Sequence, residues 1–203
     1  MINQKTKRFT LLALFIAIEV VVATVPFLGY IPIGFIDATT LHIPVIIAGI
    51  LLGKKEGAIL GFVFGLTSMI QATLAPSATS FIFSPFVSVA GISGGLPSLF
   101  IAFVPRILIG YLAGLIYEIL TNKCQDTIGM MIAALCGSIT NTILVLSSIY
   151  LFYGQAYADA IHVPYTAIIA FIMGVVTTNG IVEAILGAVI ALAVCKIGKR
   201  IIH

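Results

Sequence analysis

Residues 41–53, LHIPVIIAGILLG, are followed by the charged turn Lys54-Lys55-Glu56 and then by residues 57–74, GAILGFVFGLTSMIQATL. Both runs are almost entirely apolar, and the turn between them is charged. This pattern is typical of two helices that contact lipid and reverse direction at the membrane surface. The first run is short for a membrane span, so we expect it to be tilted or extended by its flanks.

The composition of the whole chain agrees with a membrane protein. Of its 203 residues, 61% are hydrophobic and only 8% are charged, and the mean hydropathy is +1.22. Soluble domains carry about 25% charged residues, so a water-soluble fold could not cover its surface with so few. Since a span needs about 20 apolar residues, the chain has room for six or seven.

Four further apolar runs bring the total to six. We therefore expect an all-α membrane protein, a bundle of six transmembrane helices that forms one domain over residues 1–203. The first run resembles a signal peptide, but its length favours a retained span. Loops rich in turn formers are expected at 27–40, 75–97 and 154–164, and a basic tail at 196–200. The additional runs are residues 9–26, 98–120, 127–153 and 165–195.

The basic residues predict the orientation of the bundle. With six spans, nine of the ten fall on one side, which the positive-inside rule assigns to the cytoplasm. Both termini are then cytoplasmic, in a multi-pass protein of the cell membrane. The tenth, Arg106, lies inside the fourth run. The nine are Lys5, Lys7, Arg8, Lys54, Lys55, Lys123, Lys196, Lys199 and Arg200.

Several function classes lack their motifs. The sequence has no phosphate-binding loop for ATP, no HExxH and no GxSxG, so we expect no catalytic residue and no cofactor of its own. The basic residues are not clustered as in a nucleic-acid interface. The cysteines, Cys124, Cys136 and Cys195, lack metal-ligand spacing and are expected to be reduced.

Arg106 is the most informative single residue. A charge inside a span is costly and normally faces a partner, a cavity or a ligand. Two interpretations remain open. Arg106 pairs with a buried acid (Glu19, Glu118 or Glu183), or it binds an anionic ligand, because its planar fork suits a carboxylate.

Other polar groups lie within or beside the runs. Asn141 lies in the fifth, while Asn179 and Glu183 share a face of the sixth at i, i+4 spacing. They either hydrogen-bond between helices or line a polar pocket. His42 begins the second run, where it is an interfacial hydrogen-bonding residue or a ligand-binding group.

Small residues mark two helix faces. Gly57, Gly61 and Gly65 share a face of the third run, for packing within the bundle or for sliding against another subunit. Ala13 and Ala17 form a smooth strip on the first run, which suits packing or the docking of a partner.

The chain resembles the substrate-binding S components of energy-coupling factor vitamin transporters. Its length, six runs, Ala-xxx-Ala strip and long outer loops carry the resemblance. Residues 38–53, 57–66 and 80–86 are similar to the pantothenate-specific branch in particular.

The resemblance implies a mechanism. An S component binds a vitamin from outside and docks on a transmembrane coupling protein with two cytoplasmic ATPases, whose ATP hydrolysis drives release inside. The strip of Ala13 and Ala17 would meet the coupling protein. Candidate substrate-binding residues are Arg106, Asn141, Asn179, Phe81, Phe83 and His42.

The substrate and the class of function have alternatives. One arginine, amides and aromatic rings suit pantothenate, while biotin, niacin and folate also carry carboxylates. The absence of tryptophan counts against thiamin or riboflavin, although riboflavin stays open. From another class, a membrane-embedded enzyme or scaffold could use Arg106 and Glu183.

Overall fold

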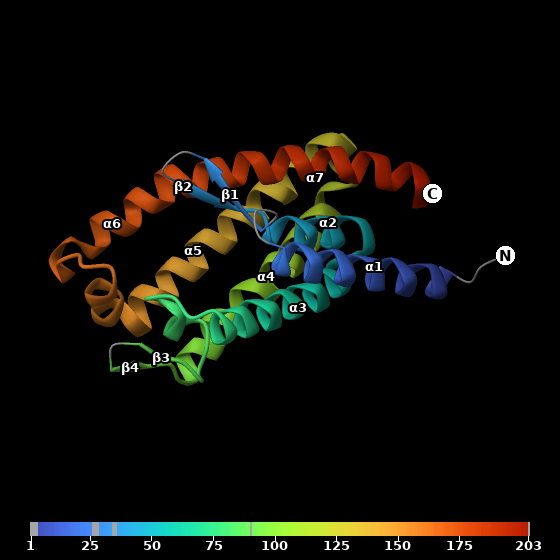
Figure 1. Cartoon of the computed structure of the whole chain (residues 1–203). Coiled ribbons are helices and arrows are strands. Elements are labelled where there is room, and N and C mark those ends of the chain that lie inside the picture. The colour runs from blue at the N-terminus through green and yellow to red at the C-terminus, as the bar shows by residue number, and fades with distance from the viewer. Residues whose placement is uncertain (1–3, 26–28, 34–35, 90, 203) are drawn as a thin grey trace.

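The computed structural model describes residues 4–25, 29–33, 36–89 and 91–202. It is a helical bundle with two short β-hairpins, as Figure 1 shows. A last helical rod consists of α6, a π turn at Val176–Gly180 and α7. The other main elements are α1 (Gln4–Thr24), β1 (Tyr30–Ile33), β2 (Ile36–Thr39), α2 (His42–Leu52), α3 (Lys54–Leu74), β3 (Ser88–Val89), β4 (Ile92–Ser93), α4 (Leu96–Leu120), α5 (Asp126–Ala160), α6 (Ile168–Val175) and α7 (Ile181–Ile202). Short 3₁₀ turns lie at Ser80–Ile82 and Tyr165–Ala167.

The prediction of an all-α membrane bundle is confirmed. Within the described ranges, α3, α4, α5 and the run Tyr165–Arg200 are long and apolar enough to cross a membrane. α2 has 11 residues, about 16 Å at 1.5 Å per residue, which is half the roughly 30 Å hydrocarbon layer. The first hairpin precedes α2, and Thr40 donates its N–H to the carbonyl oxygen of Gly29 at its base.

The short helix α2 forms the centre of the bundle. Ten of its eleven residues are buried, and it packs against α1, α3, α4, α5 and α7. A helix that is apolar on all sides belongs in a core. Its side chains make up much of the main hydrophobic cluster, together with Leu60, Ile109 and Met130.

The closest helix contact joins α3 to α4. A Cβ added at Gly61 would lie 2.1 Å from the carbonyl oxygen of Arg106, and one added at Gly57 would lie 2.5 Å from that of Gly110. Only glycine allows backbones to approach so closely. The glycine face of the third run therefore packs within the bundle.

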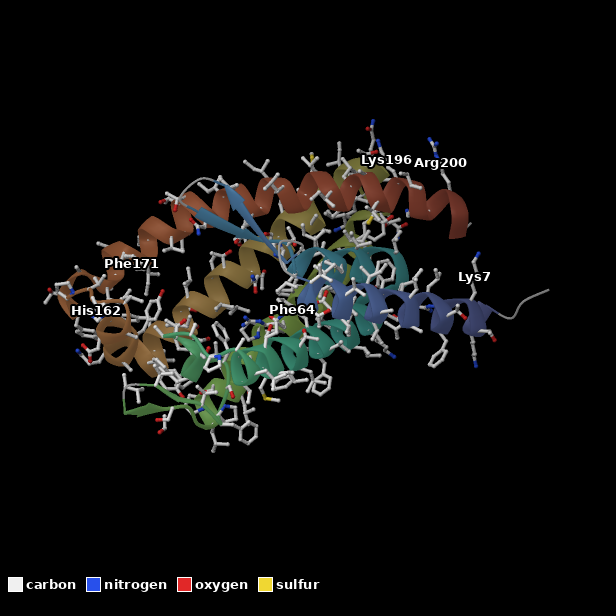
Figure 2. The ribbon with its side chains drawn as sticks, in the orientation of Figure 1. Lys7, Phe64, His162, Phe171, Lys196 and Arg200 are labelled. Carbon is white, nitrogen blue, oxygen red and sulfur yellow. The ribbon has the colours of Figure 1, made fainter. Side chains whose placement is uncertain are left out.

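Both termini lie at the same end of the bundle (Figure 1). Figure 2 places Lys7, Lys196 and Arg200 there, and His162 and Phe171 at the opposite end. Ion pairs of 2.7 to 2.9 Å join the helices at this basic end, namely Arg8–Glu56, Lys54–Glu118 and Lys199–Asp126. The basic residues that the sequence places on one side of the bundle therefore gather at one end of it in the structure.

Four predicted boundaries were wrong. α1 begins at Gln4 rather than at residue 9. The expected turn Lys54-Lys55-Glu56 is the first turn of α3, because the chain reverses at Gly53, whose φ is 116°.

The other two boundaries are at the ends of α5 and α7. Helix α5 does kink at Tyr153, where the fifth run was expected to end, but residues 154–160 continue as helix and not as loop. Gln155 donates to Asp159 at 3.0 Å across one turn of this last stretch. The expected tail 196–200 is helical as well. Its cations stabilise the end of α7 through the helix dipole, and Lys199 bonds Asp126.

Candidate functional site

A cavity of about 600 Å³ lies between α3, α4, α5 and the last rod. Its walls combine hydroxyl and amide groups with apolar side chains, and its volume is typical of small-molecule sites. The helices contribute Phe64, Ser68, Gln71, Ala72, Arg106, Asn141, Thr142, Val145, Leu146, Val175, Asn179, Gly180 and Glu183; the connecting segments contribute Leu41, Ala75, Ser77, Thr79, Ser80 and Phe83.

Arg106 is buried, with 7% of its surface exposed. Pro105 precedes it and has no N–H to donate to the carbonyl of Ile101, one turn earlier. The guanidinium of Arg106 takes that role, since its Nη1 donates to the Ile101 oxygen at 2.6 Å. The proline thus leaves an acceptor that helps to orient the arginine.

Two aromatic rings flank the guanidinium. Its central carbon lies 5.4 Å from the ring centroid of Phe64 and 5.0 Å from that of Phe83. Cation–π contacts of this kind fix the orientation of an arginine and shield it from water. Phe64 comes from α3, where Figure 2 shows it inside the bundle, and Phe83 comes from the connection between α3 and α4.

The three acids considered as partners of Arg106 are in different places. Glu118 pairs with Lys54 at 2.9 Å. Glu19 is fully buried, and neither of its carboxylate oxygens has a hydrogen-bond partner among the described residues. Glu183, 9% exposed, lines the same cavity as Arg106. These are the two charged side chains of the described lining.

Amide and hydroxyl groups from α5 and from the π turn also line the cavity. Asn141 and Thr142 come from α5, and Asn179 comes from the π turn. The Asn141 Oδ1 is buried and has no hydrogen-bond partner within the described part of the chain. Gly180 lets the two helices approach, because a Cβ there would lie 3.0 Å from the Thr142 methyl. An unsatisfied buried acceptor suggests a ligand donor at this position.

The structure brings four of the predicted substrate-binding residues together, namely Arg106, Asn141, Asn179 and Phe83. Phe81 lies behind the cavity wall, fully buried in a cluster with Ile82, Ile101 and Ile149.

His42 is buried one residue beyond the lining residue Leu41, and its Nε2 lies 3.0 Å from the hydroxyl oxygen of Ser138. It therefore contributes to the helix packing below the cavity.

Sequence reasoning missed the contribution of α3. Phe64, Ser68 and Ala72 recur at four-residue spacing and face the cavity with Gln71. The polar Ser68 and Gln71 within an apolar run were the available signal.

Ala13 and Ala17 lie elsewhere, on α1. Both are exposed, whereas Glu19 and Ala23 of the same helix are buried. The strip faces away from the bundle, so packing within this chain does not account for it.

Comparisons with known proteins agree with this architecture. Residues 7–195 match the family described as ECF transporter, substrate-specific component. The pantothenic acid transporter PanT of Lactococcus lactis subsp. cremoris is 40% identical over 196 residues, which cover 95% of this chain and 93% of that protein. The pantothenate transporter PanT of Leuconostoc mesenteroides is 30% identical, covering 96% and 93%.

A solved structure has the same fold. The crystal structure of an S component for biotin, from an ECF-type ABC transporter, covers 97% of this chain with a TM-score of 0.58 and 22% sequence identity, and 95% of that chain is covered in turn. The family and the apolar spans make the protein a multi-pass transport protein of the cell membrane. The chain belongs to the substrate-specific components, or S components, of ECF transporters.

Proposed function

We propose that this S component binds pantothenate from outside the cell and delivers it to the cytoplasm when docked on an ATP-driven energy-coupling module. The observation that supports a substrate with a carboxylate is the single arginine, flanked by aromatic rings, on the wall of a polar cavity. The likeness to two pantothenate transporters along most of the chain supports it.

The chemistry of the cavity fits pantothenate group by group. Its carboxylate would pair with the guanidinium of Arg106. Its amide and hydroxyls would bond to Asn141, Asn179 and Thr142, and its gem-dimethyl group would contact apolar lining such as Val145. The described lining holds one cation, Arg106, and one acid, Glu183, beside several neutral polar groups, so a ligand with a single carboxylate would bind at the arginine and meet mostly neutral groups along the rest of its length.

Transport requires partners. The exposed strip of Ala13 and Ala17 would contact the transmembrane coupling protein, and two cytoplasmic ATPases would bind and hydrolyse ATP. This chain would itself need no cofactor. Both termini and the basic end would then face the cytoplasm, and the cavity would open to the outside.

The test is equilibrium binding to the purified chain in detergent, without partner subunits. By calorimetry we expect nanomolar affinity for pantothenate and at least 100-fold weaker binding of biotin, niacin, folate and riboflavin, a difference of about 2.7 kcal/mol or more. Preference for another vitamin would reassign the substrate within the family. Failure to bind any of the five would contradict the proposal.

A further inference from the structure

The wall of the cavity includes a lid segment, residues 77–83, which carries Phe83 over Arg106. The segment contains the 3₁₀ turn Ser80–Ile82 and contacts α4 and α5 on its other side. The residues that make these contacts lie outside the described lining of the cavity.

Tyr153 is the point of contact on α5. Its backbone departs from helical geometry, with φ −132° and ψ 18°, and forms a kink between the long first stretch of α5 and the short helical stretch that ends at Ala160. Its ring meets that of Phe81 edge-on, with centroids 5.5 Å apart and planes at 76°. Its hydroxyl oxygen lies 2.7 Å from the hydroxyl oxygen of Ser98 on α4.

The direction of these hydrogen bonds follows from the proton of Ser98. A serine hydroxyl has one proton to donate, and Ser98 donates it to the carbonyl oxygen of Phe81 at 2.6 Å. Tyr153 must then donate to Ser98. The chain of bonds runs from α5 through α4 into the backbone of the lid segment, two residues before Phe83.

A second contact limits movement of the same segment. A Cβ added at Gly94 would lie 2.0 Å from the carbonyl oxygen of Ser84 and 2.9 Å from that of Phe81. The backbone before α4 therefore packs directly on the lid segment. At the other side, the hydroxyl of Ser84 lies 2.7 Å from that of Thr73 on α3.

We propose that Tyr153 is a positioning residue for the substrate site: through Ser98 and Phe81 it holds Phe83 over the guanidinium of Arg106. The inference rests on the proposed function of the cavity. A covered guanidinium binds a carboxylate more strongly because water is excluded and the local dielectric constant is low. Loss of the anchor would therefore weaken recognition of the carboxylate and leave the rest of the site intact.

The first experiment compares two ligands by calorimetry, pantothenate and its alcohol analogue, in which a hydroxymethyl group replaces the carboxylate. Tyr153→Phe removes the hydroxyl and keeps the ring. This variant should lower the affinity for pantothenate by about tenfold, which corresponds to about 1.4 kcal/mol of binding free energy, and should change the affinity for the alcohol little. Tyr157→Phe, one turn along α5 in the same cluster, is the matched control and should change neither.

Ser98→Ala should reproduce the effect of Tyr153→Phe, and the double variant should lose no more than either single variant, because both act through one chain of bonds. The proposal would be overturned if Tyr153→Phe lowered the affinities for the two ligands equally. It would also be overturned if the variant lowered the melting temperature but left the ratio of the two affinities unchanged, because Tyr153 would then have only a structural role.

A second measurement needs no ligand. The sequence has no tryptophan, so Phe83→Trp places the protein's single tryptophan at the lid, where excitation at wavelengths that tyrosine does not absorb reports on it alone. Adding Tyr153→Phe should shift its emission to the red and increase quenching by acrylamide, while adding Tyr157→Phe should not. Unchanged fluorescence would overturn the anchoring role. If the unmodified chain bound no pantothenate, the proposed function would be wrong, but the fluorescence measurement would still test whether Tyr153 holds the lid segment in place.

Discussion

Arg106 shows how a neighbouring residue prepares a charged side chain in a membrane helix. Pro105 is buried in α4 and leaves the carbonyl of Ile101 without its usual helical donor. The guanidinium supplies a donor and is flanked by two aromatic rings. Polar groups inside a bilayer must be satisfied within the protein, and here the same contacts orient the arginine at the cavity wall.

The first prediction concerns this side chain. Arg106→Ala should weaken pantothenate binding by roughly two to four orders of magnitude, because two charge-assisted hydrogen bonds of about 1.5–3 kcal/mol each are lost. Arg106→Lys should restore only part of the affinity, since an ammonium group cannot replace the planar fork. Calorimetry and the melting temperature of the ligand-free protein are the two measurements.

The melting temperature separates the two roles of Arg106. If the arginine chiefly balances the charge of Glu183, Arg106→Ala should destabilise the ligand-free protein. A variant that melts early and still binds pantothenate with normal affinity would remove Arg106 from the substrate site.

At the scale of elements, the contact between α3 and α4 determines the shape of the cavity. Gly61 packs on the carbonyl of Arg106, so the two helices meet at the backbone of the site's only arginine. Any side chain at this position must move α4, which carries Arg106.

We therefore expect Gly61→Val to lower the free energy of unfolding by about 1–3 kcal/mol, the usual cost of overpacking, and to weaken ligand binding as well. Gly174→Ala is the control, because an added Cβ there meets no atom within 4 Å. Thermal unfolding and calorimetry measure both effects. Normal stability of Gly61→Val would contradict the close contact of the two helices.

α1 presents its alanine strip outward while it is joined to the bundle at both ends. Arg8 donates to the carbonyl of Leu52 and pairs with Glu56, and Gln71 donates to the carbonyl of Ala23. The strip between these contacts is a fixed, smooth surface.

Replacing both Ala13 and Ala17 by Trp should abolish pantothenate uptake by cells and leave binding to the isolated chain near normal, because bulk there separates partner helices without reaching the cavity. Uptake of labelled pantothenate and calorimetry on the purified variant test this. Leu14→Trp, at another exposed position of α1, is a control for insertion of the ring into lipid. Undiminished uptake by the double variant would show that the strip docks nothing.

At the scale of the whole molecule, the basic end and the cavity define two sides. Both termini and the three ion pairs lie at the basic end. The exposed Asp159 lies near the end of α5, towards the opposite side.

The orientation predicts that Asp159→Cys, in a chain whose native cysteines are replaced, reacts with an impermeant thiol reagent in intact cells. Lys123→Cys, in the connection between α4 and α5 at the basic end, should react only after permeabilisation. Labelling is detected on the purified protein by a shift in mass. The reverse pattern would place the basic end outside and overturn the topology.

The sequence by itself determined the class of the fold and its polarity. Long apolar runs in a chain with few charges require a bilayer, and charged turns can lie only at its surfaces. The extents of α2 and α4 were therefore predicted to within two residues. Local polarity misled at the starts of α1 and α3 and at the ends of α5 and α7, where charged and polar residues belong to the helices instead of ending them.

Only the tertiary structure decided which polar residues meet. Arg106, Asn141, Asn179 and Phe83 come from four segments far apart in the chain, and their common cavity depends on how the helices rotate and cross. Phe81 and Phe83 have nearly the same sequence environment, yet one anchors the lid segment and the other faces the guanidinium. Helical periodicity determines which residues share a face of a helix. Which other helix that face contacts depends on the packing of glycines and apolar side chains along the whole bundle.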